Sequence, residues 1–177
     1  MLPAAARRRM SGNRNVITIG VISDTHGLLR PEALAQLKGS DYIIHAGDIG
    51  DPAILDKLAE IGPVTAVRGN VDRAAWARKI PATNLLEAAG ICIHVLHDLT
   101  ELDLKPEAAG FVAVISGHTH TAKQATKNGV LYFNPGSAGP RRFHLPVTVG
   151  RLLVNGAELR GDILEISRRT AISDRAE

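Results

Sequence analysis

The sequence predicts an α/β fold built from two packed β-sheets, and three observations indicate this class. The chain has 177 residues, enough for one compact domain with a full hydrophobic core. Only 3% of the residues are aromatic although 45% are hydrophobic, so aliphatic side chains must build the core, as in β-rich α/β proteins. The first half alternates strands with helices, whereas the second half pairs strands around tight turns. We expect no linker that would divide the domain.

In the first half, each short apolar run is followed by a polar loop and then by a helical pattern. Pro31 and Pro52 occupy positions typical of a first helical turn, and Gly39 and Gly62 are stops. The alternation predicts parallel strands with right-handed crossovers, whose polar loops lie at the edge where open α/β sheets bind ligands. The expected strands are Val16–Ile22, Tyr42–Ala46 and Val64–Val67.

In the second half, three pairs of apolar runs each flank a turn. Asn128-Gly129 and Asn155-Gly156 are strong type I′ turn signals, and Ala89-Gly90 separates the third pair. These hairpins predict a second, mostly antiparallel sheet packed on the first. The expected strands are Asn84–Ala88 with Ile91–Leu96, the single strand Phe111–Ser116, Gln124–Lys127 with Val130–Asn134, and Val147–Val154 with Glu158–Ile166.

The two ends of the chain carry much of its formal net charge of +3. We expect a disordered basic extension over residues 1–15, a domain over residues 16–167 and a polar tail over residues 168–177. The extension lacks the apolar region of a signal peptide, no apolar run approaches a membrane span, and the single Cys92 excludes an intramolecular disulfide. We therefore expect a cytoplasmic protein with no membrane partner.

Polar residues that can bind metals follow five of the expected strands. Carboxylate, amide and imidazole donors in this mixture suit manganese, iron, nickel or zinc, and the absence of thiolates argues against a structural zinc finger. Each motif alone is commonly a turn or a surface pair, so the hypothesis depends on their recurrence after strands. The candidate ligands are Asp24, His26, Asp48, Asn70, His97, His118 and His120.

Seven candidate ligands favour two cations over one, because a single catalytic zinc site uses three protein ligands and keeps one position open. A carboxylate can bridge two ions, and Asp48 is our candidate for the bridge. In an extended segment residues i and i+2 point the same way, so Asp24 and His26 can face one ion. A turn between His118 and His120 could instead direct these two histidines to different ions.

Taken in order, these residues resemble the motifs of the calcineurin-like metallophosphoesterases, most closely those of the small bacterial and archaeal phosphodiesterase branch. The resemblance rests on Asp-x-His, Gly-Asp, Gly-Asn-x-Asp, a strand-end His and Gly-His-x-His, together with Asn-Pro-Gly-Ser at residues 134–137. It implies an αββα sandwich of two mixed β-sheets flanked by helices. It also implies one ion held by Asp24, His26, Asp48 and His120, and another held by Asp48, Asn70, His97 and His118.

The sequence departs from the family pattern in two places. Many members have a histidine after Gly-Asn that is thought to protonate the leaving group, whereas Val71 stands here and cannot transfer a proton. The family usually has Gly-His after the strand-end histidine, whereas Asp98-Leu99 follows His97. His94 is a second candidate for the role of His97, although it is expected to face another direction.

These observations predict a dinuclear phosphoesterase that hydrolyses phosphodiesters by a metal-bridging hydroxide, with Asn70, His97 and Asp72 as its catalytic residues. Asp72 is either a carboxylate that orients a ligand such as His26 or a turn residue bonded to its own backbone. Manganese is the favoured ion, with nickel, iron and zinc as alternatives. We expect a small phosphodiester as substrate and leave a homo-oligomer open.

Two other functions remain open at this stage. One is a non-catalytic protein-interaction scaffold like the retromer subunit, although a scaffold need not keep every ligand. The other is a nucleic-acid-binding protein that depends on its basic ends; otherwise nucleic acid enters only as a substrate.

Overall fold

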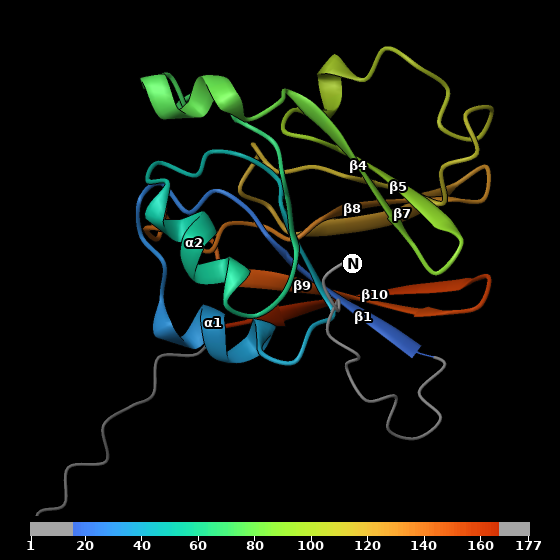
Figure 1. Cartoon of the computed structure of the whole chain (residues 1–177), viewed down its shortest axis with the longest axis horizontal. Helices are drawn as coiled ribbons and strands as arrows, with labels where there is room; N and C mark the ends of the chain where they lie inside the picture. Colours follow the sequence, from blue (N-terminus) through green and yellow to red (C-terminus); the bar gives the residue numbers. More distant parts are fainter. Residues whose placement is uncertain (1–15, 167–177) are drawn as a thin grey trace, which may run out of the picture.

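The computed structural model describes residues 16–166 and shows two five-stranded sheets packed face to face (Figure 1). The basic extension and the polar tail expected from the sequence lie outside the described residues. Within residues 16–166, no helix is long and apolar enough to cross a membrane.

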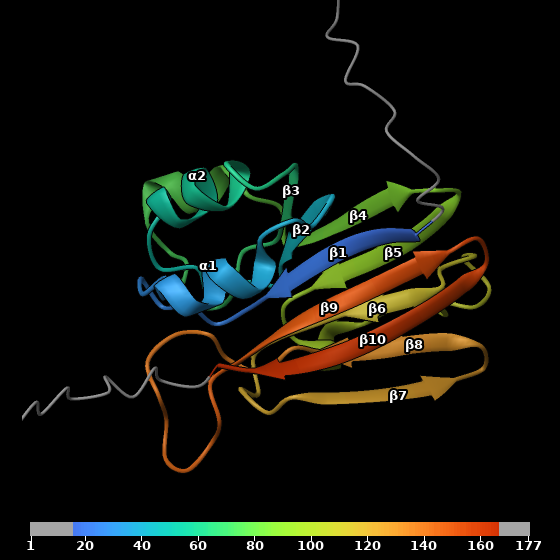
Figure 2. The same ribbon diagram turned by 90° about the horizontal axis from the view of Figure 1, so that it is seen from below.

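The first sheet has the strand order β10-β9-β1-β2-β3. Strands β1, β2 and β3 are parallel, as the alternation of strands and helices predicts, and β9 and β10 pair antiparallel beside β1 (Figure 2). The bounds are β1 Val16–Ile22, β2 Tyr42–His45, β3 Val64–Ala66, β9 Thr148–Asn155 and β10 Glu158–Glu165.

The second sheet has the order β4-β5-β6-β8-β7. Its outer pairs β4–β5 and β7–β8 are antiparallel hairpins, but β6 lies between β5 and β8 and is parallel to both. The bounds are β4 Thr83–Ala88, β5 Ile91–Leu96, β6 Ala113–Ile115, β7 Lys123–Lys127 and β8 Val130–Asn134.

The mostly antiparallel second sheet expected from the sequence is wrong in two respects. All three hairpins form, but the last, β9–β10, joins the first sheet instead of the second. The single run Phe111–Ser116 forms only the short strand β6, which inserts between two hairpins. A tight turn fixes the pairing of the two strands it joins, whereas the choice of sheet depends on contacts distant in sequence.

The main hydrophobic core lies between the sheets and is contributed by both. It contains buried aliphatic side chains of β1, β2, β4, β5, β6 and β9, together with Phe133 of β8. Phe133 packs against the first sheet, where Gly150 of β9 and Gly161 of β10 leave room for its ring, because a Cβ at either glycine would collide with it. The low aromatic content thus leaves one large ring at the centre of the interface between the sheets.

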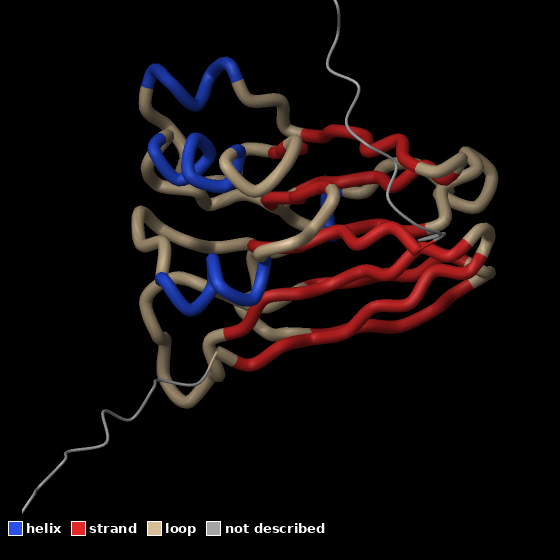
Figure 3. The backbone as a smooth tube through the Cα atoms, turned by 60° about the horizontal axis from the view of Figure 1, so that its bottom comes forward, coloured by secondary structure: helices blue, strands red, loops and turns tan. Residues whose placement is uncertain are grey.

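Both α-helices cover the outer face of the first sheet. The helices α1 (Pro31–Leu37) and α2 (Ala53–Ala59) bury Leu37 and Leu58 in a second core with Ile22 and Ile43, and the 3₁₀-helix η1 (Ala75–Lys79) packs on the same core through Trp76. Figure 3 shows these helical segments together toward one end of the strand layers. Over the outer face of the second sheet, within residues 16–166, the helical structure is limited to the short η2 (Leu99–Glu101) and the loop around it.

We predict that Phe133→Ala lowers the free energy of unfolding by about 3–5 kcal/mol, because it leaves a cavity between two rigid sheets. Urea denaturation of the metal-free protein measures the change. Phe143→Ala is the matched control, since Phe143 is 92% exposed, and it should change stability by less than about 0.5 kcal/mol. Equal losses in the two variants would contradict this account of the core.

Candidate metal centre

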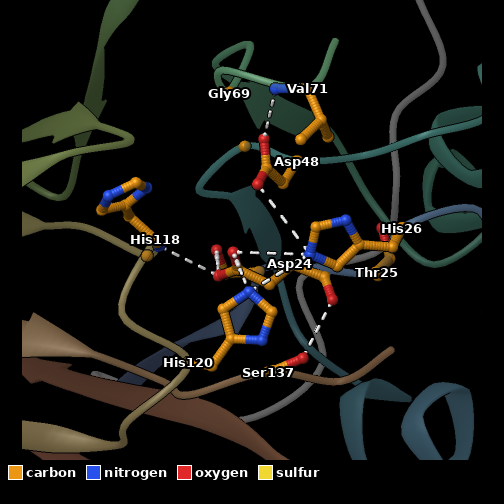
Figure 4. A network of polar contacts seen from close by, with 12 residues as sticks. Asp24, Thr25, His26, Asp48, Gly69, Val71, His118, His120 and Ser137 are labelled. Carbon is orange, nitrogen blue, oxygen red and sulfur yellow. Dashed lines mark hydrogen bonds and ion pairs between the residues drawn. The ribbon is translucent and has the colours of Figure 1, made fainter. Parts of the chain in front are cut away.

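The predicted ligands gather at one end of the two sheets because each sheet contains three parallel strands. The parallel sets are β1-β2-β3 and β5-β6-β8, and loops with candidate ligands follow β1, β2, β3, β5 and β6. The carboxyl ends of the two sets converge, so loops far apart in sequence bring their side chains into one cluster (Figure 4).

Four of the side chains form a compact set of oxygen and nitrogen donors. One donor atom from each residue lies within 4.8 Å of the others in the set Asp24, His26, Asp48 and His120. Asp24 Oδ1 is 3.2 Å from His120 Nε2 and 4.0 Å from His26 Nε2, and the two histidine nitrogens are 3.2 Å apart. A divalent cation suits this set, because four oxygen and nitrogen donors from four side chains lie this close together.

The other three candidates lie on the far side of Asp48. Asp48 Oδ2 is 3.8 Å from His26 Nε2 and 3.3 Å from His97 Nε2, so this oxygen faces both groups of donors. Asn70 Oδ1 lies 3.2 Å from His97 Nε2 and 3.2 Å from His118 Nδ1. The structure therefore brings all seven predicted side chains together, with Asp48 between the two groups.

The ring of His97 is oriented by a backbone carbonyl. Its Nδ1 is 2.7 Å from the carbonyl oxygen of Ala46, and because this oxygen can only accept, Nδ1 carries the hydrogen and donates it. The other nitrogen, Nε2, is the atom that faces Asp48 and Asn70. A metal-binding histidine typically donates its second ring N–H in this way, which fixes its orientation.

Burial and charge shift the pKa values in the cluster in opposite directions. Burial raises the pKa of Asp24 to about 6, and burial followed by the charge of Arg142 lowers that of His120 to about 4. Burial also opposes the charges of Asp48 and His97, but their mutual hydrogen bond, helped by other hydrogen bonds and charges, outweighs it; the pKa of Asp48 is lowered and that of His97 is raised. Carboxylates and neutral imidazoles are the forms that bind metals.

The environment of one buried carboxylate oxygen, Asp24 Oδ1, shows whether a cation suits this cluster. Asp24 Oδ1 is fully buried and accepts no hydrogen bond, whereas Oδ2 accepts from Ser23 Oγ at 2.6 Å and from the His118 backbone N–H at 3.1 Å. A buried carboxylate oxygen without a donor is costly, and a cation beside His26 and His120 would remove this cost. The donor set therefore fits a divalent metal.

The site loops adopt an uncommon backbone conformation. Asp24, His26, Asp48, His118 and His120 all have positive φ angles, between 46° and 68°. Residues other than glycine rarely adopt this left-handed region. Each such residue lowers stability by about 1–3 kcal/mol, so surrounding contacts must impose the conformation. The extended segment expected for Asp24 and His26 is therefore wrong; the two side chains converge because tight turns direct them.

Two glycines next to ligands are needed for close approach rather than for backbone freedom. A Cβ at Gly69 would collide with the carboxylate of Asp48, and one at Gly117 would collide with Ser23 Oγ. Gly69 therefore allows two loops of the first sheet to approach closely, and Gly117 does the same for loops of different sheets.

Asp72 does not orient His26 as one of the two sequence hypotheses suggested. Its buried carboxylate accepts hydrogen bonds from the backbone N–H groups of Ile49 (3.1 Å), Gly50 (2.9 Å) and Gly69 (2.8 Å). The bond to Gly69 is the local turn contact of the alternative hypothesis, and the other two tie this turn to the loop that carries Asp48. Asp72 thus holds the backbone of the loops that carry Asp48 and Asn70, and it contacts the predicted ligands only indirectly.

A network of polar side chains that the sequence argument left without a role holds the ligand loops. His45 Nδ1 accepts from the Gly47 N–H, and its Nε2 lies 2.9 Å from Thr25 Oγ1, which donates to the Ile49 carbonyl. Ser137 Oγ donates to the Asp24 carbonyl, and Asn134 Nδ2 donates to the Gly117 carbonyl. Asn134 and Ser137 begin and end the Asn-Pro-Gly-Ser motif, which is how the sequence could have indicated them. In the structure they fix the loops of His118 and Asp24.

The two departures from the family pattern lie at the edge of the cluster. Val71 is 46% exposed, and its N–H donates to Asp48 Oδ1 at 3.0 Å. Asp98 caps η2 by accepting from Thr100, and its Oδ2 is 3.5 Å from His118 Nε2. His94 is buried and stacks on Phe111, with ring centroids 5.2 Å apart, so it is not part of the cluster.

Residues 17–156 match the calcineurin-like phosphoesterase superfamily domain, and the chain belongs to this family. A probable metallophosphoesterase of Methanocaldococcus jannaschii is 39% identical over 132 residues, which are 67% of each chain. Family membership and the cluster of aspartates and histidines together define a metal-dependent phosphoesterase that uses a divalent metal.

Two solved structures show the same fold at lower identity. The structure of a novel archaeal phosphodiesterase is 23% identical, with a TM-score of 0.68, and the match covers 84% of this chain and 100% of that one. Vps29 of Chaetomium thermophilum is 18% identical, with a TM-score of 0.68, over 85% of this chain and 97% of that one. At these identities the likeness concerns the fold alone.

Burial of His45 leads to a prediction for the metal-free protein. Burial, followed by the charge of His97, lowers the pKa of His45 from 6.5 to about 3, so the unfolded state binds more protons between these pH values. The contribution of His45 to stability is therefore complete above pH 6.5 and is lost as the pH falls toward 3, with a slope of at most about 1.4 kcal/mol per pH unit. Urea titrations at several pH values measure this slope, and His45→Gln should reduce it. Parallel pH profiles for the two proteins would show that His45 does not titrate as described.

Proposed function

We propose that the protein hydrolyses phosphodiesters with two divalent cations, held by two ligand sets that share Asp48. The observation that carries the proposal is the position of Asp48 Oδ2, which lies between His26 of one set and His97 of the other. The first set would be Asp24, His26, Asp48 and His120. The second would be Asp48, Asn70, His97 and His118. A carboxylate shared in this way suits two cations about 3.5–4 Å apart.

Bound cations of this kind supply hydroxide near neutral pH and neutralise charge on phosphate oxygens. The protein's own side chains would hold these cations in position. His97 keeps Nε2 directed at the centre because its Nδ1 hydrogen is held by the Ala46 carbonyl. Asn70 is the one amide among the proposed ligands, and its NH₂ group can donate to a phosphate oxygen while its Oδ1 faces the second set.

The preference for diesters rests on the residues that flank these ligands. Val71 follows Asn70 and offers no proton to a departing oxygen, so an ester with a poor leaving group loses a contribution worth about 10²–10⁴-fold. The archaeal phosphodiesterase with the same fold supports a diester as substrate. Manganese is the proposed ion, because the donor set combines carboxylates, an amide and imidazoles without thiolates.

A non-catalytic scaffold is the second candidate, and the likeness to Vps29 favours it. The arrangement of the ligands favours catalysis. All seven side chains converge, and five of these residues have positive φ angles that reduce stability. A surface used only to bind other proteins does not need such strained residues.

A hydrolysis panel tests the proposal. The protein is stripped of metal and reloaded with manganese, nickel, iron or zinc, and bis(4-nitrophenyl) phosphate is compared with 4-nitrophenyl phosphate and with unactivated monoesters. We expect manganese-dependent turnover of the diester and poor turnover of the monoesters. Val71→His should raise the rate for diesters with poor leaving groups by up to about 10²-fold. Equal rates on diesters and unactivated monoesters would sink the diester assignment, and tight metal binding without turnover of any ester would favour the scaffold.

Two histidines three residues apart provide a matched pair for the second metal site. We expect His97→Ala to reduce turnover by more than about 10²-fold and to lower the manganese stoichiometry from two toward one, because it removes a ligand and its fixed N–H. His94→Ala changes a buried histidine outside the cluster and should retain two ions per chain. Metal analysis and isothermal titration measure both quantities. Retention of two ions by the His97 variant would show that the second set is wrongly assigned.

A further inference from the structure

A groove of about 670 Å³ lies on the outer face of the second sheet. Ile115 and Phe133 point into the core between the sheets, so their neighbours Ser116, Tyr132 and Asn134 point outward and line the groove. The segment from Asp98 to Thr100 lines it as well, and so do Lys123, Ala125 and Lys127 on β7. This is the face on which, within residues 16–166, no α-helix packs.

The groove lies next to the metal centre. Among its lining residues, Asp98 directly follows His97, Gly117 precedes His118, and Thr119 lies between His118 and His120. The side chain of His118 is 41% exposed, and its Nε2 is 3.5 Å from Asp98 Oδ2. The ring of His118 therefore lies between Asn70 of the predicted ligands and Asp98 of the groove.

The groove lining is suited to an apolar group. Leu99, Ala125 and Tyr132 are among its lining residues, and most of the surface that the groove exposes is apolar. The one carboxylate, Asp98, is already engaged by the Thr100 N–H and hydroxyl. Lys123 and Lys127 each lie two residues from Ala125, on the same strand face, and their positive charges suit an anionic ester. The volume is within the range of small-molecule sites.

Leu99 is the residue in the groove that most distinguishes this chain. It is 40% exposed although it is a large aliphatic side chain, and it occupies one of the two positions after His97 where the sequence departs from Gly-His. Exposure of one leucine lowers the stability of the free protein only slightly, and covering this side chain with an apolar ligand contributes favourable free energy to binding.

We propose that the groove binds an apolar ester group of the size of one or two aromatic rings, with Leu99 and Tyr132 as the specificity-determining residues. This inference rests on the proposed function, because it takes the phosphate to be held by the ligands of the metal centre. The phosphate provides the anchor, and the groove selects among diesters by the area of carbon surface that they bury.

Product-like monoesters test the groove without requiring turnover. Isothermal titration of the manganese-loaded protein compares methyl, phenyl and 1-naphthyl phosphate. We expect 1-naphthyl phosphate to bind at least about tenfold more tightly than methyl phosphate, because it buries more apolar area. Leu99→Lys and Tyr132→Ala should bring the two affinities together. Leu85→Lys is the matched control, since Leu85 is 46% exposed on β4 outside the groove, and it should preserve the preference.

A second readout does not depend on metal. In the metal-free protein, methyl resonances of Leu99 and Ala125 should shift on addition of 1-naphthyl phosphate, whereas those of Leu85 should not. Equal affinities of the wild-type protein for methyl and naphthyl esters would overturn the proposal. It would also be overturned if Leu99→Lys dissociated a dimer while the naphthyl preference persisted, because the groove would then be a subunit interface.

The groove and the proposed function fail in different ways. Naphthyl preference without hydrolysis of any diester would support the groove and contradict the catalytic proposal. Hydrolysis of diesters without any naphthyl preference would support catalysis and contradict the groove.

Discussion

The ionic contact between Asp48 and His97 connects the two sheets, and the rest of the site is arranged around it. Asp48 follows β2 of the first sheet and His97 follows β5 of the second, and their side chains meet at 3.3 Å in a buried position. Burial opposes both charges, so the contact persists only because hydrogen bonds from Val71 and to Ala46 support its two partners.

The conformation of the loops shows how much of the structure serves this arrangement. Five of the seven ligands have left-handed backbone, and the strain must be offset by contacts that hold each loop from several sides. His45, Thr25, Ser137 and Asn134 provide these contacts through backbone carbonyls and N–H groups, and Asp72 does the same for the loop of Asp48. Strain and its compensation together place donors of both sheets around one volume, which is the preorganisation that a metal-dependent hydrolase requires.

The sequence predicted most elements of the fold and all the members of the cluster, but not the arrangement of the second sheet. Alternating strands and helices predicted β1, β2 and β3, and the Asn-Gly turns predicted two hairpins, because both signals are local. The insertion of β6 between β5 and β8 depends on parallel pairing across long connections, which leaves little local trace. This insertion nevertheless matters for function, since it places His118 at the same edge as His97.

By itself, the sequence determined which residues offer donor atoms for a metal, because donor type and position after a strand are properties of the chain. Tertiary structure alone decided that Asp48 faces both groups of donors, that Asp72 binds backbone instead of His26, and that His94 is excluded from the cluster. It also decided that the groove beside Leu99 lies next to the centre, through the contact of Asp98 with His118. Side-chain direction in these loops follows from left-handed backbone and from contacts between two sheets, and neither is encoded in the spacing of residues along the chain.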